Sequence, residues 1–158
     1  MNGILGLHSL LRWAMVIFLI VNIVRVNVEA DQHFDELDKK WSLRLLITTH
    51  LNLVAALILY FFGENGIQIV IREKYQMKDV METGWLRFWI IEHPLMMLIC
   101  IALITVSHSF SKKMDLAPAK KHRIMSILYI LALVIILAAA PWPFRDVSIA
   151  RPWFRGLY

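Results

Sequence analysis

The chain has 158 residues, of which 59% are hydrophobic and 18% are charged, with a mean hydropathy of +0.60 and a formal net charge of +5. This composition excludes a disordered chain and argues against a soluble domain. The charged residues gather between apolar runs, so the positive charge indicates the loop bias of a membrane protein and not nucleic-acid binding. The one cysteine, Cys100, lies within an apolar run, and a single cysteine excludes an intramolecular disulfide.

The first apolar run covers residues 4–26 and is interrupted by His8, Arg12 and Asn22. These three residues are spaced so that they share one face of a helix. The opposite face carries Leu10 and Ile17 and is expected to meet lipid. The run is long enough to cross a bilayer, which needs about 20 mostly apolar residues.

The charged segment 27–41 follows and is expected to be a solvated loop or a short surface helix. The second apolar run covers residues 43–62 and carries His50 in its interior. Residues 63–66, Gly-Glu-Asn-Gly, have the composition of a turn and are expected to end this helix. Segment 67–83 mixes apolar and charged residues, which predicts a loop with an interfacial piece.

The third apolar run covers residues 86–108 and contains Glu92 and His93 near its beginning. An ionisable residue inside a membrane span is by default a candidate functional residue. Pro94 cannot donate a hydrogen bond to the carbonyl of Ile90, and its ring crowds that turn of the helix. We therefore expect a kink beside His93.

The fourth apolar run covers residues 122–140 and is closed by Pro141-Trp142-Pro143, with a tail that is expected to lie along the membrane surface. Four spans with short links predict an all-α fold: one domain, residues 1–158, that forms an integral-membrane up-down-up-down four-helix bundle. Both termini then share one side. The first and third connections and their flanks hold nine of the cations, namely Arg25, Lys39, Lys40, Arg44, Lys112, Lys113, Lys120, Lys121 and Arg123, against seven on the terminal side. The positive-inside rule therefore places both termini outside.

The depth of each histidine follows from the rise of a helix, about 1.5 Å per residue. By this count His8 lies about 10 Å and His93 about 6 Å toward the terminal side of the midplane, on diagonal helices. Two imidazoles facing each other at similar depth suit the iron of a b-type haem. His50 lies about 4–5 Å toward the other side, so pairing of His50 with His93 stays open. A second haem between His50 and His122 is disfavoured, because their depths differ by about 10 Å.

Three further residues fall in the same outer half as His8 and His93. Arg12 is a candidate partner of a haem propionate or of Glu92. We expect Arg12 and Glu92 to form a charge network, direct or bridged by haem, between the first and third spans. Tyr60 and Glu92 are candidates for proton exchange at a quinone site.

Each of these features also has a purely structural interpretation. The histidines within the spans can be hydrogen-bonded core residues, and Arg12 with Glu92 can be an ion pair that only holds helices together. His108 and His122 are expected to be solvated residues at the membrane boundary, and His33 a plain loop residue. No C-x-x-C-H motif is present, so covalently attached haem is not supported.

Four stretches carry a resemblance to a known family: residues 7–13 (LHSLLRW), 49–52 (THLN), 92–97 (EHPLMM) and 141–144 (PWPF). They resemble small four-span bacterial membrane proteins that are catalogued as cytochrome b. The resemblance covers nearly the whole chain and is most specific at 92–97. It implies haem b but does not assign the histidines that hold it.

The leading hypothesis is an integral-membrane b-type cytochrome of the bacterial inner membrane. It would move electrons between membrane quinone and a redox partner, in contact with other respiratory subunits. One rival is a non-haem accessory subunit of a larger membrane assembly. A second rival is a membrane enzyme of porphyrin or quinone metabolism that uses the histidines as acid–base groups.

Overall fold

A computed structural model describes residues 1–28, 34–113 and 115–154 of the chain. These residues form helices and turns, and none of them lies in a strand. The helices in chain order are α1 (Asn2–Val28), α2 (Glu36–Phe62), α3 (Ile67–Arg72), α4 (Met77–Glu82), α5 (Gly84–Arg87), the π-helix η1 (Phe88–Glu92), α6 (His93–Ser111) and α7 (Pro118–Ala139). The all-α fold class is confirmed.

Four stretches of the described chain are long and apolar enough to cross a membrane: Asn2–Val28, Glu36–Arg72, Gly84–Ser111 and Pro118–Ala139. They correspond to the four predicted spans and are typical of a multi-pass membrane protein. Their outward faces are apolar, because large side chains such as Ile17, Val54 and Val134 are more than half exposed. Such faces are stable in contact with lipid.

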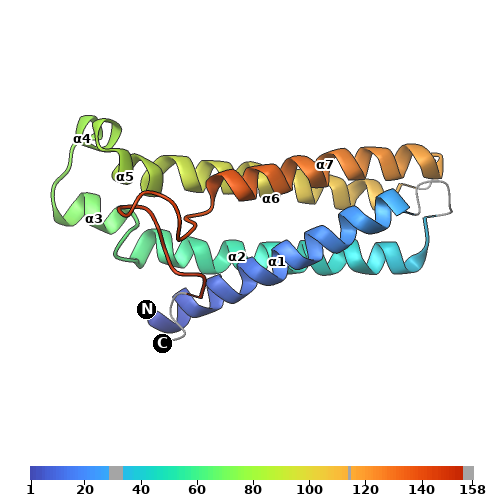
Figure 1. The fold of residues 1–158 in the computed structure, drawn as a ribbon, viewed down its shortest axis with the longest axis horizontal. Coiled ribbons are helices and arrows are strands. Elements are labelled where there is room, and N and C mark those ends of the chain that lie inside the picture. The colour runs from blue at the N-terminus through green and yellow to red at the C-terminus, as the bar shows by residue number, and fades with distance from the viewer. Residues whose placement is uncertain (29–33, 114, 155–158) are drawn as a thin grey trace.

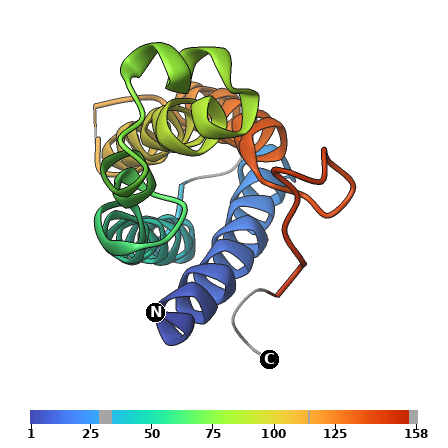
Figure 2. The same ribbon diagram turned by 90° about the vertical axis from the view of Figure 1, so that its left-hand side faces the viewer.

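The long helices lie side by side, with α1 against α2 and α7, and with α6 against α2 and α7 (Figure 1). The beginning of α1 and the tail up to residue 154 lie at the same end of the molecule (Figure 1). Seen from that end, α1 and α6 lie on opposite sides of the group, and α1 is tilted relative to its neighbours (Figure 2). Leu19, Leu45 and Ile104 are fully buried and form part of an apolar core between the long helices.

The second long helix begins earlier than the hydropathy of the sequence predicts. Asp35 is its N-cap, and the capping box is complete: the Asp35 carboxylate accepts from the Asp38 backbone N–H at 2.8 Å, and Asp38 accepts from Asp35 N–H at 3.1 Å. Arg25 of α1 donates to the Asp38 carboxylate at 2.9 Å. Residues 36–41, expected as loop or surface helix, are therefore the first turns of α2.

The sequence predicts a kink beside His93, and the structure has a π-turn at this point. The N–H of His93 donates to the carbonyl of Phe88, five residues earlier, so the helix widens just before the proline. Pro94 has no N–H that could donate to the Ile90 carbonyl. This carbonyl instead accepts a hydrogen bond from the Tyr60 hydroxyl of α2 at 3.2 Å. A hydrogen bond between two spans thus replaces the backbone hydrogen bond that the proline removes.

The C-terminal residues 141–154 fold back over the beginning of α1. The carbonyl of Trp153 accepts from Trp13 Nε1 at 2.9 Å and from Arg12 at 2.7 Å. The N–H of Arg151 donates to the carbonyl of Pro141 at 3.0 Å and closes the tail into a loop. The tail therefore covers one end of the helices. His33 and Arg155 lie outside the described residues.

Candidate ligand-binding cavity

A cavity of about 560 Å³ lies at the end of the molecule where α1 begins. Its walls come from the first half of α1, the second half of α2, the turn after α2, the η1–α6 junction and the tail. Its size is that of a small-molecule or cofactor site. Most of its wall is apolar, and its polar residues within the spans include His8, Arg12, Thr49, Asn52, Tyr60 and His93. Four of the residues singled out in the sequence are thus brought together: His8, Arg12, Tyr60 and His93.

The tautomer of His93 is set by its surroundings. Its Nδ1 lies 2.8 Å from the carbonyl oxygen of Ala139 in α7. A carbonyl can only accept, so Nδ1 carries the proton of the neutral ring, and Nε2 keeps the free lone pair. This arrangement is usual for a metal-binding histidine, whose second nitrogen donates to a carbonyl or carboxylate. The rings of Phe88 and Trp89 pack around it, with ring centroids 5.6 and 5.7 Å from that of His93.

His8 reaches the same cavity from α1. It lies beside Asn52 and within electrostatic range of both Arg12 and His93. Its Nδ1 is buried and has no hydrogen-bond partner among the described residues. A buried imidazole nitrogen of this kind is costly unless a ligand or water satisfies it. One nitrogen of the His8 ring is therefore available to a ligand, while Asn52 lies within hydrogen-bonding reach of the ring.

Other buried polar atoms at the cavity also have no partner within the described chain, namely Thr49 Oγ1, Asn52 Oδ1 and Trp89 Nε1. Trp89 was not identified from the sequence. Its spacing could have identified it as a cavity residue, because Trp89 lies four residues before His93 and so shares that helix face. These groups provide a hydroxyl, an amide and an indole N–H for the polar part of a ligand.

Arg12 is held by the tail. Its Nη2 donates to the Trp153 carbonyl, and its guanidinium carbon lies 5.6 Å from the ring centroid of Trp13 and 6.0 Å from that of Trp142. Its Nε is buried without a partner among the described residues. Arg12 thus places a positive charge at the cavity with donor capacity to spare.

The predicted direct pair between Arg12 and Glu92 is not formed. Glu92 accepts instead from Arg87 Nε at 2.7 Å, and it is half-exposed and not part of the cavity lining. The physical reason is the η1 turn, which brings Arg87 and Glu92, five residues apart, to the same side of one helix.

His50 is turned away from the cavity. It is exposed on the outer face of α2, and its Nδ1 lies 2.9 Å from the Leu46 carbonyl of its own helix. The structure therefore does not bring His50 together with His93 or with His122. His8 and His93 are the predicted pair that share a cavity.

The expectation that His108 and His122 are solvated is wrong. Both are buried at the opposite end of the molecule, and His122 has no exposed surface. His108 Nδ1 is hydrogen-bonded to Ser42 at 2.9 Å, and Ser42 to Tyr129 at 3.0 Å. The amphipathic spacing of α6 and α7 turns these imidazoles inward together with Lys121, whereas Lys112, Lys113 and Lys120 are exposed.

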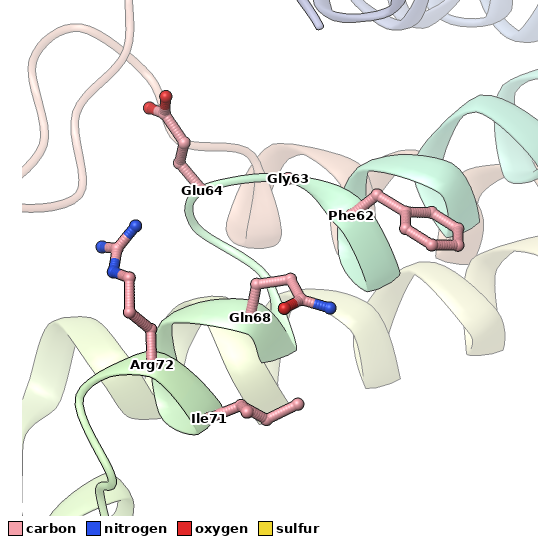
Figure 3. A pocket seen from close by; sticks show the side chains of 6 residues that line it. All are labelled: Phe62, Gly63, Glu64, Gln68, Ile71 and Arg72. Carbon is pink, nitrogen blue, oxygen red and sulfur yellow. The ribbon is translucent and has the colours of Figure 1, made fainter.

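A second hollow, of about 570 Å³, lies where α2 passes into α3 (Figure 3). Its lining residues are Phe62, Gly63, Glu64, Gln68, Ile71 and Arg72, and all except Gly63 are exposed. It contains none of the residues that the sequence singled out. It is therefore a surface depression and not a candidate site.

Over the described ranges, no group of three or more His, Cys, Asp or Glu side chains is arranged to hold a metal ion. Comparison of the chain with protein-family models, with curated proteins and with solved structures found no match.

Proposed function

We propose that this chain is a b-type cytochrome of the bacterial inner membrane and that its cavity holds one haem b between His8 and His93. The proposal includes an up-down-up-down bundle with both termini outside. The observation that carries it is that two histidine side chains, from α1 and from α6, line one cavity of cofactor size. Haem suits such a pair because its macrocycle supplies four iron ligands and leaves one or two to the protein.

The residues around the cavity fit this role. The Ala139 carbonyl fixes the His93 tautomer and increases the basicity of Nε2. Arg12, with its unpartnered Nε, suits a propionate. Haem would supply one-electron exchange, and the protein would bind the group, orient it and exclude water. Membrane quinone and a further respiratory subunit are the electron partners in this proposal.

The accessory-subunit hypothesis is less well supported. It requires the polar residues of the spans to face neighbouring subunits. In α1 and α6 the residues in question, His8, Arg12 and His93, instead line an internal cavity.

The enzyme hypothesis keeps one supporting observation. Thr49 and Trp89 offer polar atoms to the cavity that a haem between two histidines does not need. A quinone or porphyrin substrate would use them, with His8 and His93 as acid–base groups.

The test is a reduced-minus-oxidised spectrum of protein purified from cells with ample haem supply. We expect a Soret band and a b-type α band. His93→Ala and His8→Ala should each remove or shift most of the absorbance, because each removes a proposed iron ligand. His50→Ala is the matched control, since this histidine faces outward, and it should leave the spectrum unchanged.

A wild-type preparation without a Soret band would exclude the cytochrome and favour the enzyme hypothesis. An effect of His50→Ala equal to that of His93→Ala would show that the ligands are wrongly assigned.

A further inference from the structure

The end of the molecule opposite the cavity has two connections of very different charge. The connection between α6 and α7, with its flanks, has a single carboxylate, Asp115, against five cations: Lys112, Lys113, Lys120, Lys121 and Arg123. In the connection between α1 and α2, acidic residues are at least as numerous as basic residues, because Asp35, Glu36 and Asp38 lie beside its lysines. The positive charge of this end is therefore concentrated at one corner.

The cations of that corner are available to a ligand. Lys112, Lys113, Lys120 and Arg123, here called the cationic corner, are all exposed, and none forms an ion pair within the described part of the chain. At the α1–α2 connection, in contrast, Lys39 pairs with Glu36 at 2.6 Å. The charges of the α1–α2 connection are partly neutralised, whereas those of the cationic corner are not.

The beginning of α7 combines cations with the free N–H groups of a helix N-terminus. The first turn of this helix contains Lys120 and Lys121, no acidic residue, and no side-chain cap. The positive end of the helix dipole repels cations, and its free N–H groups attract anions. An anion at the cationic corner would relieve both penalties.

The corner also lies at the level of lipid headgroups. It joins the end of one candidate span, Ser111, to the beginning of the next, Pro118. The ammonium of Lys113 lies 4.5 Å from the ring centroid of Phe110, so an aromatic ring and a cation lie together there. Aromatic rings and basic side chains at the end of a span are typical of the headgroup region.

We propose that the cationic corner binds the phosphate of an anionic phospholipid headgroup. The chemistry is that of juxtamembrane lysine clusters, where each Lys or Arg adds to the attraction for acidic lipid. This inference concerns the surface between α6 and α7 and does not depend on haem in the cavity.

The test compares thermal stability of the full chain in vesicles of phosphatidylcholine alone and in vesicles with added phosphatidylglycerol. The wild type should gain stability from the anionic lipid, and the gain should disappear at high salt, where exposed charges are screened. The variant K113Q/K120Q/R123Q should lose most of the gain. Its affinity for phosphatidylglycerol should fall on the order of a hundredfold.

The variant K39Q/K40Q/R44Q is the matched control. It removes two lysines and one arginine from the same end of the molecule, but at the α1–α2 connection, and it should keep the gain. The charge-conserving variant K113R/K120R/R123K should keep it as well and so guards against a folding defect. Equal loss in both Gln variants, or no gain in the wild type, would overturn the proposal. Inorganic phosphate that reproduces the gain in phosphatidylcholine vesicles would also overturn the assignment to lipid.

Discussion

At the scale of single residues, Pro94 shapes the wall of the cavity. It removes the donor for the Ile90 carbonyl, and the Tyr60 hydroxyl takes that place at 3.2 Å. The preceding residue, His93, donates its backbone N–H to Phe88 in the π-turn. Its ring is hydrogen-bonded to the Ala139 carbonyl of α7. One proline therefore positions a tyrosine and a candidate ligand histidine together.

We expect Tyr60→Phe to lower the free energy of unfolding by about 1–3 kcal/mol, because the Ile90 carbonyl then lacks a donor. In the background of Pro94→Ala the same change should cost much less, since an N–H at position 94 can reach Ile90 in a regular helix. Unfolding in detergent measures both. Tyr75→Phe is the control, because no hydrogen bond of its hydroxyl is present in the described structure. Equal costs of Tyr60→Phe in the two backgrounds would contradict this account.

At the scale of the helix, α2 is extended by its capping box into the charged segment. Hydropathy predicted a span from residue 43, because Lys39 and Lys40 make the preceding turns polar. Asp35 and Asp38 nevertheless satisfy the first free N–H groups of the helix, so it begins at Glu36. The ends of a helix and the ends of a membrane span are therefore different boundaries in this protein.

Asp35→Ala should lower the free energy of unfolding by about 0.5–2 kcal/mol, as loss of an N-cap usually does. Asp35→Asn should cost less, because its amide oxygen still accepts from Asp38 N–H. The hydrogen bond from that N–H lowers the pKa of Asp35 in the folded protein. The charge of Asp35 therefore stabilises the fold above the ordinary carboxyl pKa, and this contribution is lost as pH falls through the lowered pKa.

The measurement is the unfolding free energy of wild type and Asp35→Asn as a function of pH. The difference between them should shrink in acid. A difference that stays constant down to the acid limit would show that the carboxylate charge has no part in the cap.

At the scale of the whole molecule, two polar regions lie at opposite ends. The cavity of His8 and His93 lies where α1 begins, and the buried His108 and His122 lie in the parts of α6 and α7 next to their connection. Fully buried apolar side chains, such as Leu45 and Ile104, occupy the core between the helices. The two ends are therefore expected to respond to mutation independently.

A double-mutant cycle can test whether Arg12 and Glu92 link the first and third spans. Arg12 bonds to the tail and Glu92 to Arg87, so they share no partner. Arg12→Met and Glu92→Gln should therefore add within about 0.3–0.5 kcal/mol. Glu92→Gln with Arg87→Met should instead show a coupling of about 0.2–1 kcal/mol, the usual range for a half-exposed pair. Thermal unfolding in detergent measures both cycles, and strong coupling of Arg12 to Glu92 would restore the network predicted from sequence.

The sequence by itself was sufficient for the four apolar spans, the turn at residues 63–66 and the loss of one helical hydrogen bond at Pro94. These features depend on local properties: run length, turn composition and the missing N–H of proline. The inward face of α1 could also be predicted, because His8, Arg12 and Asn22 recur at helical spacing.

Only the tertiary structure decided which polar side chains meet. Thr49 and His50 are neighbours in the sequence and both polar, yet successive residues point about 100° apart around a helix. Thr49 lines the cavity and His50 faces outward, a choice set by the packing of α2 against α1 and α6. The partner of Arg12 was likewise beyond local reasoning, because the Trp153 carbonyl that it binds lies 141 residues away in the chain. Spacing along one helix predicts a shared face, but contacts between distant segments follow from how the whole chain packs.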